Sequence, residues 1–289
     1  MSSDQKPWTD RLVVVTASAN TERALACFDS WKDRAFYRFE LVIAEGRTAD
    51  GYIPPVPAFA AGVAEALEQC PKAEVIACFH DDLLIEADNW DTHVLRVFDQ
   101  VQDTGLAGFG GARGLGLDEI YKVPYNPHQL ARIDFRSNMR DAELHGSREQ
   151  WTTQVACLDG FSQIGRREFW QGFEPTLPVG IHDSDMTDYS KTAYLAQPRN
   201  RPNLFQQLTY LGFRHHFYDG ALGCFAKRLG WKAAMIPVRC HHFGGQTAVA
   251  DEGYHAWAKT QVAEGDQGFW EEAHRIGYEE FRDVLPIRV

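Results

Sequence analysis

A histidine and two adjacent carboxylates interrupt an apolar run in the first third of the chain. Val75–Phe79 is a continuous apolar segment of strand length, and His80-Asp81-Asp82 follows it directly. Unbroken hydrophobicity with β-branched residues is typical of a strand buried on both faces. Charged side chains at the carboxyl end of such a strand lie where open α/β folds bind ligands. We hypothesise that these residues hold a divalent cation at a ligand-binding edge; the alternative is a strand end that is merely acidic.

The elements around this stretch alternate between strands and helices. Strands are predicted at 11–16, 39–44 and 75–79, with helices after Asn20 and from Pro57 onward. Asn20 is a suitable N-cap, and Pro57 is suited to the first turn of a helix. The order strand, helix, strand, helix, strand predicts an α/β fold with a mostly parallel sheet flanked by helices.

The second half of the chain is less regular. We predict a helix at 90–101, a glycine-rich strand and turn at 105–113, a strand at 155–161, a short helix at 166–173, a helix near 222–229 and a strand at 233–238. The glycines at 105–113 do not form the GxGxxG pattern of a dinucleotide site, so they are expected to allow close backbone approach. Two helices are predicted in the tail, 251–289.

Composition narrows the class of protein. The chain has 289 residues and a net charge of −11, which argues against broad, nonspecific attraction to nucleic acid or anionic lipid. No apolar run approaches the roughly 20 residues that span a bilayer, and the N-terminus has no apolar segment of signal-peptide length. Six cysteines occur without a CxxC pair. We therefore expect a cytoplasmic protein without a membrane span.

A series of short motifs follows in order along the chain: Leu12–Thr16, Val42-Ile-Ala-Glu45, His80-Asp81-Asp82, Gly108-Phe-Gly-Gly-Ala-Arg113, Leu158-Asp-Gly-Phe161, Phe217-Tyr-Asp219, Cys224-Phe-Ala-Lys-Arg-Leu-Gly-Trp231 and His241-His242. Taken together, they resemble the glycosyltransferases of the GT-A fold, and in particular the family-2-like enzymes of bacteria and phages. The resemblance covers most of residues 11–247, with 180–214 as an insertion. It implies a Rossmann-like catalytic domain over about 1–250 and a helical extension over 251–289.

The resemblance implies a metal-dependent, inverting transfer of a sugar from a nucleotide-sugar donor, with a UDP-sugar expected. Mn²⁺ or Mg²⁺ would neutralise the diphosphate leaving group. Successive side chains on a strand point to opposite faces, so Asp81 and Asp82 are expected to differ in role. We assign Asp82 as the metal ligand and Asp81 as a donor contact. His80 stands where the family usually has an acid, and it either ligates the metal or only hydrogen-bonds.

Two later positions match the family's catalytic base and its late histidine. Asp219, at the start of a predicted helix, matches the base that deprotonates the acceptor hydroxyl; an ordinary N-cap is the alternative. Adjacent residues rarely both coordinate one ion, so one of His241 and His242 is expected to ligate the metal, with His241 preferred.

The remaining assignments concern the donor. Thr16 and Glu45 match contacts of the first two strands with the nucleotide. Asp159 is placed near the sugar or the acceptor, with a tight turn as the alternative. Arg113 is placed near phosphate, with a structural salt bridge as the alternative.

Other interpretations remain open. The sequence leaves the acceptor undetermined between a polysaccharide, a glycolipid and a modified nucleic-acid base. His80-Asp81 and His182-Asp183 both spell the doublet of metal-dependent phosphohydrolases, but those enzymes are all-helical and His80-Asp81 ends a strand pattern. A protein that binds a nucleotide sugar or glycan without turnover is the third possibility.

Overall fold

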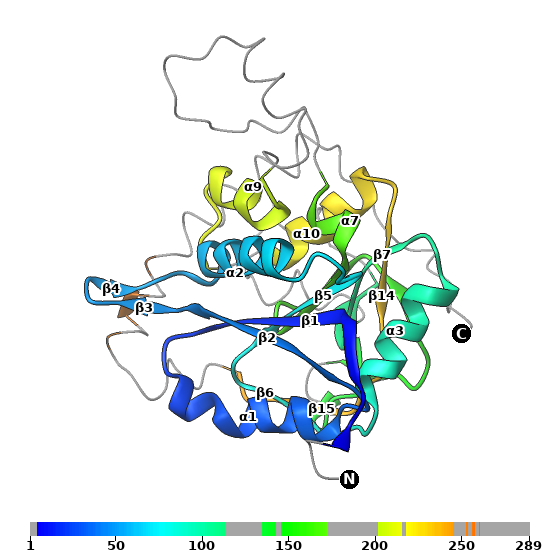
Figure 1. Cartoon of the computed structure of the whole chain (residues 1–289). Helices are drawn as coiled ribbons and strands as arrows, with labels where there is room; N and C mark the ends of the chain where they lie inside the picture. Colours follow the sequence, from blue (N-terminus) through cyan, green and yellow to red (C-terminus); the bar gives the residue numbers. More distant parts are fainter. Residues whose placement is uncertain are drawn as a thin grey trace.

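The fold is described from a computed structural model of the chain (Figure 1). The structure describes residues 5–113, 135–142, 146–172, 202–215 and 218–244, together with 253, 256, 257 and 260. Most of the expected insertion at 180–214 and of the C-terminal extension at 251–289 lies outside the described residues, as does His182-Asp183.

The described strands and helices follow one another in an α/β order. The strands are β1 Trp8–Ser18, β2 Arg38–Glu45, β3 Arg47–Thr48, β4 Gly51–Tyr52, β5 Val75–His80, β6 Leu83–Ile85, β7 Thr104–Gly108, β8 Gly110–Ala112, β9 Phe135–Ser137, β10 Ser147–Arg148, β11 Thr153–Val155, β12 Cys157–Leu158, β13 Ser162–Arg166, β14 Lys232–Met235 and β15 Cys240–His242. The helices are α1 Thr21–Arg34, α2 Pro55–Gln69, α3 Trp90–Gln100, α7 Arg167–Trp170, α9 Leu204–Tyr210 and α10 Tyr218–Arg228.

A seven-stranded sheet in the order β11-β14-β7-β13-β5-β1-β2 forms the centre of the molecule. The three strands predicted first lie next to one another: β1 pairs in parallel with both β2 and β5. The carboxyl ends of these strands therefore meet at one edge of the sheet. This part of the prediction is confirmed.

The sheet lies between two separate apolar cores. In β1, Val13 and Val15 face a cluster that includes α2, α9 and α10, whereas Leu12 and Val14 face a cluster that includes α1 and α3. Figure 1 shows α2, α9 and α10 on one side of the sheet and α1 on the other. Both faces are covered by helices, which explains why β1 and β5 read as continuous apolar runs.

The sheet is mixed rather than simply parallel, because β13 runs antiparallel to both of its neighbours, β5 and β7. We predicted one strand at 155–161; the chain instead forms β11, β12 and then β13. The sequence of β13, Ser162–Arg166, contains polar residues, and these do not indicate a buried strand. Gln163 is nonetheless fully buried, and its side-chain amide donates to Leu158 O and Asp159 O at 3.1 and 3.0 Å.

Two short strands bring a distant segment to the sheet edge. β15 pairs antiparallel with β6, so that His242 lies opposite Leu83 and next to Asp82. Phe243 N also donates to Asp82 O at 3.1 Å. Residues about 160 positions apart in the sequence are thereby joined at the carboxyl end of β5.

Candidate metal centre

The ends of three parallel strands place polar residues at the same edge. Ser18 is the partner of Glu45 in the β1–β2 register, and Ala17 is the partner of His80 in the β1–β5 register. Ser18 Oγ donates to Asp81 Oδ2 at 2.7 Å. The first carboxylate of the pair is thus held by the neighbouring strand, while Asp82 is directed elsewhere.

Asp82 lies within a group of two histidines. His242 Nε2 is 3.1 Å from Asp82 Oδ1, and His80 Nδ1 is 4.0 Å from the same oxygen. The three residues can each offer one ligand atom, all within 4.8 Å of one another. Their side chains are 18–30% exposed, so the group is reachable from solvent but largely screened from it.

The charge states of these groups differ. Burial, and after it the neighbouring His242, lowers the pKa of His80 to about 4, so this imidazole is neutral at neutral pH. Burial also works to lower the pKa of His242, but the carboxylate of Asp82 outweighs it and the pKa is raised. Burial works to raise the pKa of Asp82, and the two histidines outweigh it. Asp82 is therefore ionised and faces one neutral and one protonatable imidazole.

The donor set fits a divalent metal ion. Asp82 Oδ1 is buried, and no donor in the described part of the chain is aligned to hydrogen-bond it. A buried carboxylate oxygen without such a donor is costly unless another positive partner satisfies it. Two ligand atoms each about 2.1 Å from one ion stand at most about 4 Å apart, which accommodates both separations from Asp82 Oδ1. Two imidazoles and one carboxylate favour a transition metal such as Mn²⁺ over Mg²⁺.

His242 rather than His241 completes this group, so our preference between the two adjacent histidines needs correction. Neighbouring side chains on a strand point to opposite faces. His241 Nδ1 accordingly lies 3.8 Å from Asp141 Oδ1, and its ring packs edge-on against Phe243 with centroids 4.5 Å apart. The expectation that only one of the pair reaches the metal is consistent with this geometry.

Asp219 and Asp159 form a second acidic pair close to the metal group. Burial, then the carboxylate of Asp159, raises the pKa of Asp219 to about 7, although its N–H partners in the backbone oppose the rise. Asp159 also affects the pKa of both His80 and His242. Asp159 thus lies near the base candidate and the metal ligands at once.

Of the alternatives for these two carboxylates, only the one for Asp159 is present. Asp219 is the second residue of α10 rather than its N-cap, and its Oδ1 accepts from the N–H of Gly220 at 2.8 Å. Asp159 Oδ1 accepts from the N–H of Phe161 at 3.3 Å in the turn that leads into β13. A structural role and a chemical role are compatible here, because each carboxylate has further lone pairs.

Three other predicted donor contacts have different surroundings. Thr16 is fully buried and its hydroxyl donates to Phe79 O at 2.8 Å, so it joins β1 to β5. Glu45 is exposed at the end of β2. Arg113 follows β8 and is partly buried. Of the three, Glu45 has the most accessible side chain at the strand ends.

Sequence reasoning missed Ser18 and Tyr218. Ser18 shares a face with Thr16 because the two are separated by one residue on β1, and this period-two spacing was a usable signal. Tyr218 Oη lies 2.7 Å from His80 Nε2 and donates to Gly160 O at 3.2 Å. Its position beside Asp219 was the only signal in the sequence.

Comparisons with known proteins identify no family. No protein-family model and no curated protein matches the chain. A solved structure, "Crystal Structure of A197 from STIV", is similar to it with a TM-score of 0.41 and 11% identity, over 81% of this chain and 85% of that one. Among the described residues, no helix has the length and apolar character needed to cross a membrane.

Proposed function

We propose that this protein is a metal-dependent, inverting glycosyltransferase that moves a sugar from a nucleotide-sugar donor to an acceptor hydroxyl. The observation that carries the proposal is the group formed by His80, Asp82 and His242 at the carboxyl ends of parallel strands, with Asp219 nearby at a pKa of about 7. Ligands of open α/β sheets bind at this edge. Asp82 is the ligand at the centre of the group.

Each residue has a distinct part in this reaction. A bound Mn²⁺ or Mg²⁺ would neutralise charge on the donor's diphosphate. Asp82 and the two imidazoles would hold the ion, and Asp81, positioned by Ser18, would face the ribose or sugar. Glu45 belongs to the nucleotide side of the site and Arg113 to the phosphates, whereas Thr16, fully buried and bonded to Phe79 O, holds β1 against β5 beneath the site.

Asp219 is the general base of the proposed reaction. It takes the proton from the acceptor hydroxyl as that oxygen forms a bond to the anomeric carbon. The bond between the anomeric carbon and the diphosphate oxygen breaks, and the diphosphate leaves with the electron pair. A base works best when its pKa lies near the operating pH, which a pKa of about 7 satisfies. The carboxylate of Asp159 contributes to this raised pKa of Asp219, because a nearby negative charge opposes ionisation.

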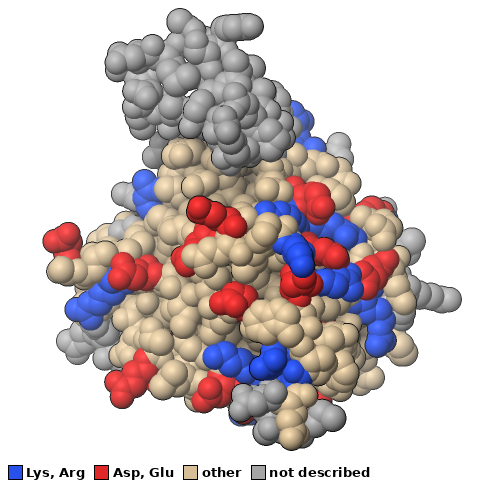
Figure 2. Space-filling view, viewed as in Figure 1, with Lys and Arg blue, Asp and Glu red and all other residues tan. Residues whose placement is uncertain are grey.

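The donor is proposed to be a UDP-sugar and the acceptor to be a polysaccharide, a glycolipid or a modified nucleic-acid base. Figure 2 shows acidic and basic side chains interspersed on the face in view, without a broad area of Lys and Arg among its described residues. With a net charge of −11, this favours a neutral acceptor over nucleic acid.

The test is release of UDP from a panel of UDP-sugars in the presence of Mn²⁺. We expect slow release that EDTA abolishes and that Asp82→Asn removes. Asp219→Asn should still bind the donor but should no longer transfer the sugar to an acceptor. His182→Ala is the control, because its doublet belongs to the phosphohydrolase alternative. Phosphate release from nucleotides without UDP release from any sugar donor would contradict the proposal.

The two alternatives predict different results in the same assay. A phosphohydrolase would release phosphate, yet the described part of the chain is α/β rather than all-helical and His80-Asp81 ends β5. A non-catalytic binder would bind a UDP-sugar in calorimetry without turnover. The raised pKa of Asp219 favours the transferase, because a binding protein has no need of a carboxylate that titrates near neutrality.

A further inference from the structure

We propose that Tyr218 is a positioning residue that fixes the tautomer of His80, so that the Nδ1 lone pair of this imidazole faces Asp82. The inference rests on the metal centre of the proposed function, but not on sugar transfer. Metal-bound histidines are commonly oriented by a hydrogen bond to the other ring nitrogen. Here a tyrosine from α10 supplies that bond.

The direction of each hydrogen bond follows from counting protons. Tyr218 Oη lies 3.2 Å from Gly160 O and 2.7 Å from His80 Nε2. A backbone carbonyl only accepts, so the single phenolic proton is donated to Gly160 O. The phenolic oxygen must then accept from Nε2–H of His80. A neutral imidazole has one N–H, so Nδ1 carries a lone pair.

That lone pair lies on the side of the metal group. His80 Nδ1 is the ring atom 4.0 Å from Asp82 Oδ1, while Nε2 is used by Tyr218. Without Tyr218, both neutral tautomers of His80 would be accessible, and the one with a proton on Nδ1 cannot bind a cation through that nitrogen. The hydroxyl therefore selects the metal-binding form before any metal arrives.

The surrounding packing leaves the Tyr218 ring little freedom. Tyr218 is 4% exposed and packs against Phe205, with centroids 5.9 Å apart. The imidazole of His80 is stacked on Phe59 with centroids 6.2 Å apart and an interplanar angle of 14°. Both partners of the hydrogen bond are thus held by aromatic side chains from α2 and α9.

Gly160 is required for this arrangement. A Cβ placed on Gly160 would stand 2.5 Å from Tyr218 Oη and 2.9 Å from its Cζ. No side chain larger than hydrogen fits there unless the hydroxyl moves away from His80. The inference therefore depends on two residues that can be altered independently.

Tyr218→Phe is the first test. In metal-free protein labelled with ¹⁵N-histidine, we expect the His80 ring to show the Nε2–H tautomer in the wild type and a mixture in the variant. The His80 signals are assigned by their loss in His80→Gln. We also expect the dissociation constant for Mn²⁺, followed by the EPR signal of the free ion, to rise about 10-fold. An Nδ1–H tautomer in the wild type would overturn the inference.

Gly160→Ala is the second test, and Tyr210→Phe is the control. Gly160→Ala should reproduce the mixed tautomer and the weaker Mn²⁺ binding while Tyr218 is still present. Tyr210 lies on α9 and is 48% exposed, so its hydroxyl can be removed without effect on either measurement. Unchanged Mn²⁺ binding in both site variants would also refute the inference. A protein that binds Mn²⁺ and shows these effects but releases no UDP would refute only the proposed function.

Discussion

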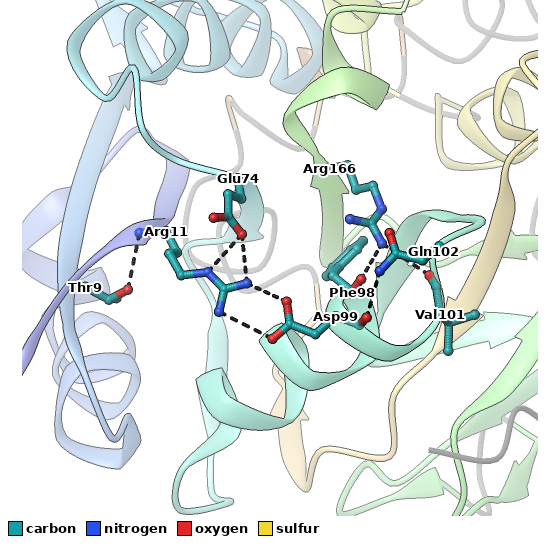
Figure 3. Close-up of polar contacts among 8 residues, drawn as sticks. All are labelled: Thr9, Arg11, Glu74, Phe98, Asp99, Val101, Gln102 and Arg166. Atoms are coloured by element: carbon teal, nitrogen blue, oxygen red, sulfur yellow. Dashed lines mark hydrogen bonds and ion pairs between the residues drawn. The ribbon is translucent and has the colours of Figure 1, made fainter.

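The carboxylates at the two ends of β1 and β5 have different kinds of positively charged partner. Where these strands begin, Arg11 donates from Nε to Glu74 at 2.8 Å and also pairs with Asp99 of α3, as Figure 3 shows. Where they end, Asp82 pairs with His80 and His242. At the beginning, one permanent cation is shared by the two carboxylates. At the end, the partners are imidazoles that can give up their protons.

A second arginine completes the first end. Arg166 donates from Nε to Thr104 O at 2.7 Å. It also donates to Phe98 O and Val101 O, two carbonyls at the end of α3 (Figure 3). Arginine remains charged at any pH at which the protein folds, so these bonds close the end of the helix permanently. This end serves stability.

The difference shows how one sheet separates stability from chemistry. A carboxylate paired with arginine has its charge already neutralised and attracts a metal ion weakly. A carboxylate paired with histidine can exchange the proton of its partner for a metal ion. The predictions below test this contrast, from the largest expected effect to the smallest.

Asp82→Asn should produce the largest change. Removing the charged ligand leaves two imidazoles without a carboxylate. We therefore expect the dissociation constant for Mn²⁺ to rise by more than about 100-fold, which exceeds the loss usually caused by removing a residue that only hydrogen-bonds a ligand. Isothermal titration calorimetry measures this directly. Glu74→Gln, which alters a carboxylate at the other end of β5, is the matched control and should leave the constant unchanged. Equal losses in the two variants would remove the contrast.

His242→Ala and His241→Ala separate two neighbours on one strand. We expect about a 10- to 100-fold weaker binding of Mn²⁺ in His242→Ala, because that imidazole approaches Asp82, and no comparable change in His241→Ala. The same calorimetric titration applies to both. A larger effect in His241→Ala would restore the preference drawn from the sequence.

The sequence predicted the β1, β2 and β5 cluster well because continuous apolar runs with β-branched residues are a strong local signal. It failed at β13, since the side-chain N–H groups of its polar Gln163 donate to two backbone carbonyls that only the folded chain supplies. Local pattern cannot register a partner that comes from elsewhere in the fold.

The metal group shows the same limit. Asp82 could be selected from its position at a strand end, and a late histidine from the resemblance. Choosing His242 required the register of β15 against β6, in which His242 lies opposite Leu83. Tyr218 required a contact across 138 residues. Neither relation is encoded in local periodicity.

Asp219→Asn should change both the stability of the fold and its dependence on pH. The folded-state pKa of Asp219 is raised to about 7, so its contribution to stability is full below the pKa of the unfolded chain and is lost as pH rises through about 7. Asparagine does not titrate. The free energy of unfolding of the wild type relative to Asp219→Asn should therefore fall between pH 5 and pH 8 by on the order of 2 kcal/mol, allowing for partial exposure.

Urea denaturation at the two pH values, with EDTA present, measures this difference. In the same variant, the residual UDP release should lack the dependence on pH near 7 that the wild type shows, because the titrating base is absent. Asp103→Asn provides a comparison at an exposed acid paired with Lys232. A pH-independent difference between wild type and Asp219→Asn would show that burial near Asp159 does not shift the carboxyl group.

Arg11→Gln should produce the smallest change, although it breaks the most extensive ion pairs at the beginning of the strands. Arg11, Glu74 and Asp99 are 37–57% exposed, and solvent-exposed pairs contribute about 0–1 kcal/mol each. We expect the free energy of unfolding to fall by about 1 kcal/mol or less, with a smaller loss at high salt, and binding of Mn²⁺ to be unchanged. Thermal unfolding at low and high salt, with a titration of Mn²⁺ at each, measures both quantities. If Arg11→Gln weakened metal binding, the two ends of β1 and β5 would be coupled through the strands, and stability and chemistry would not be separable in this sheet.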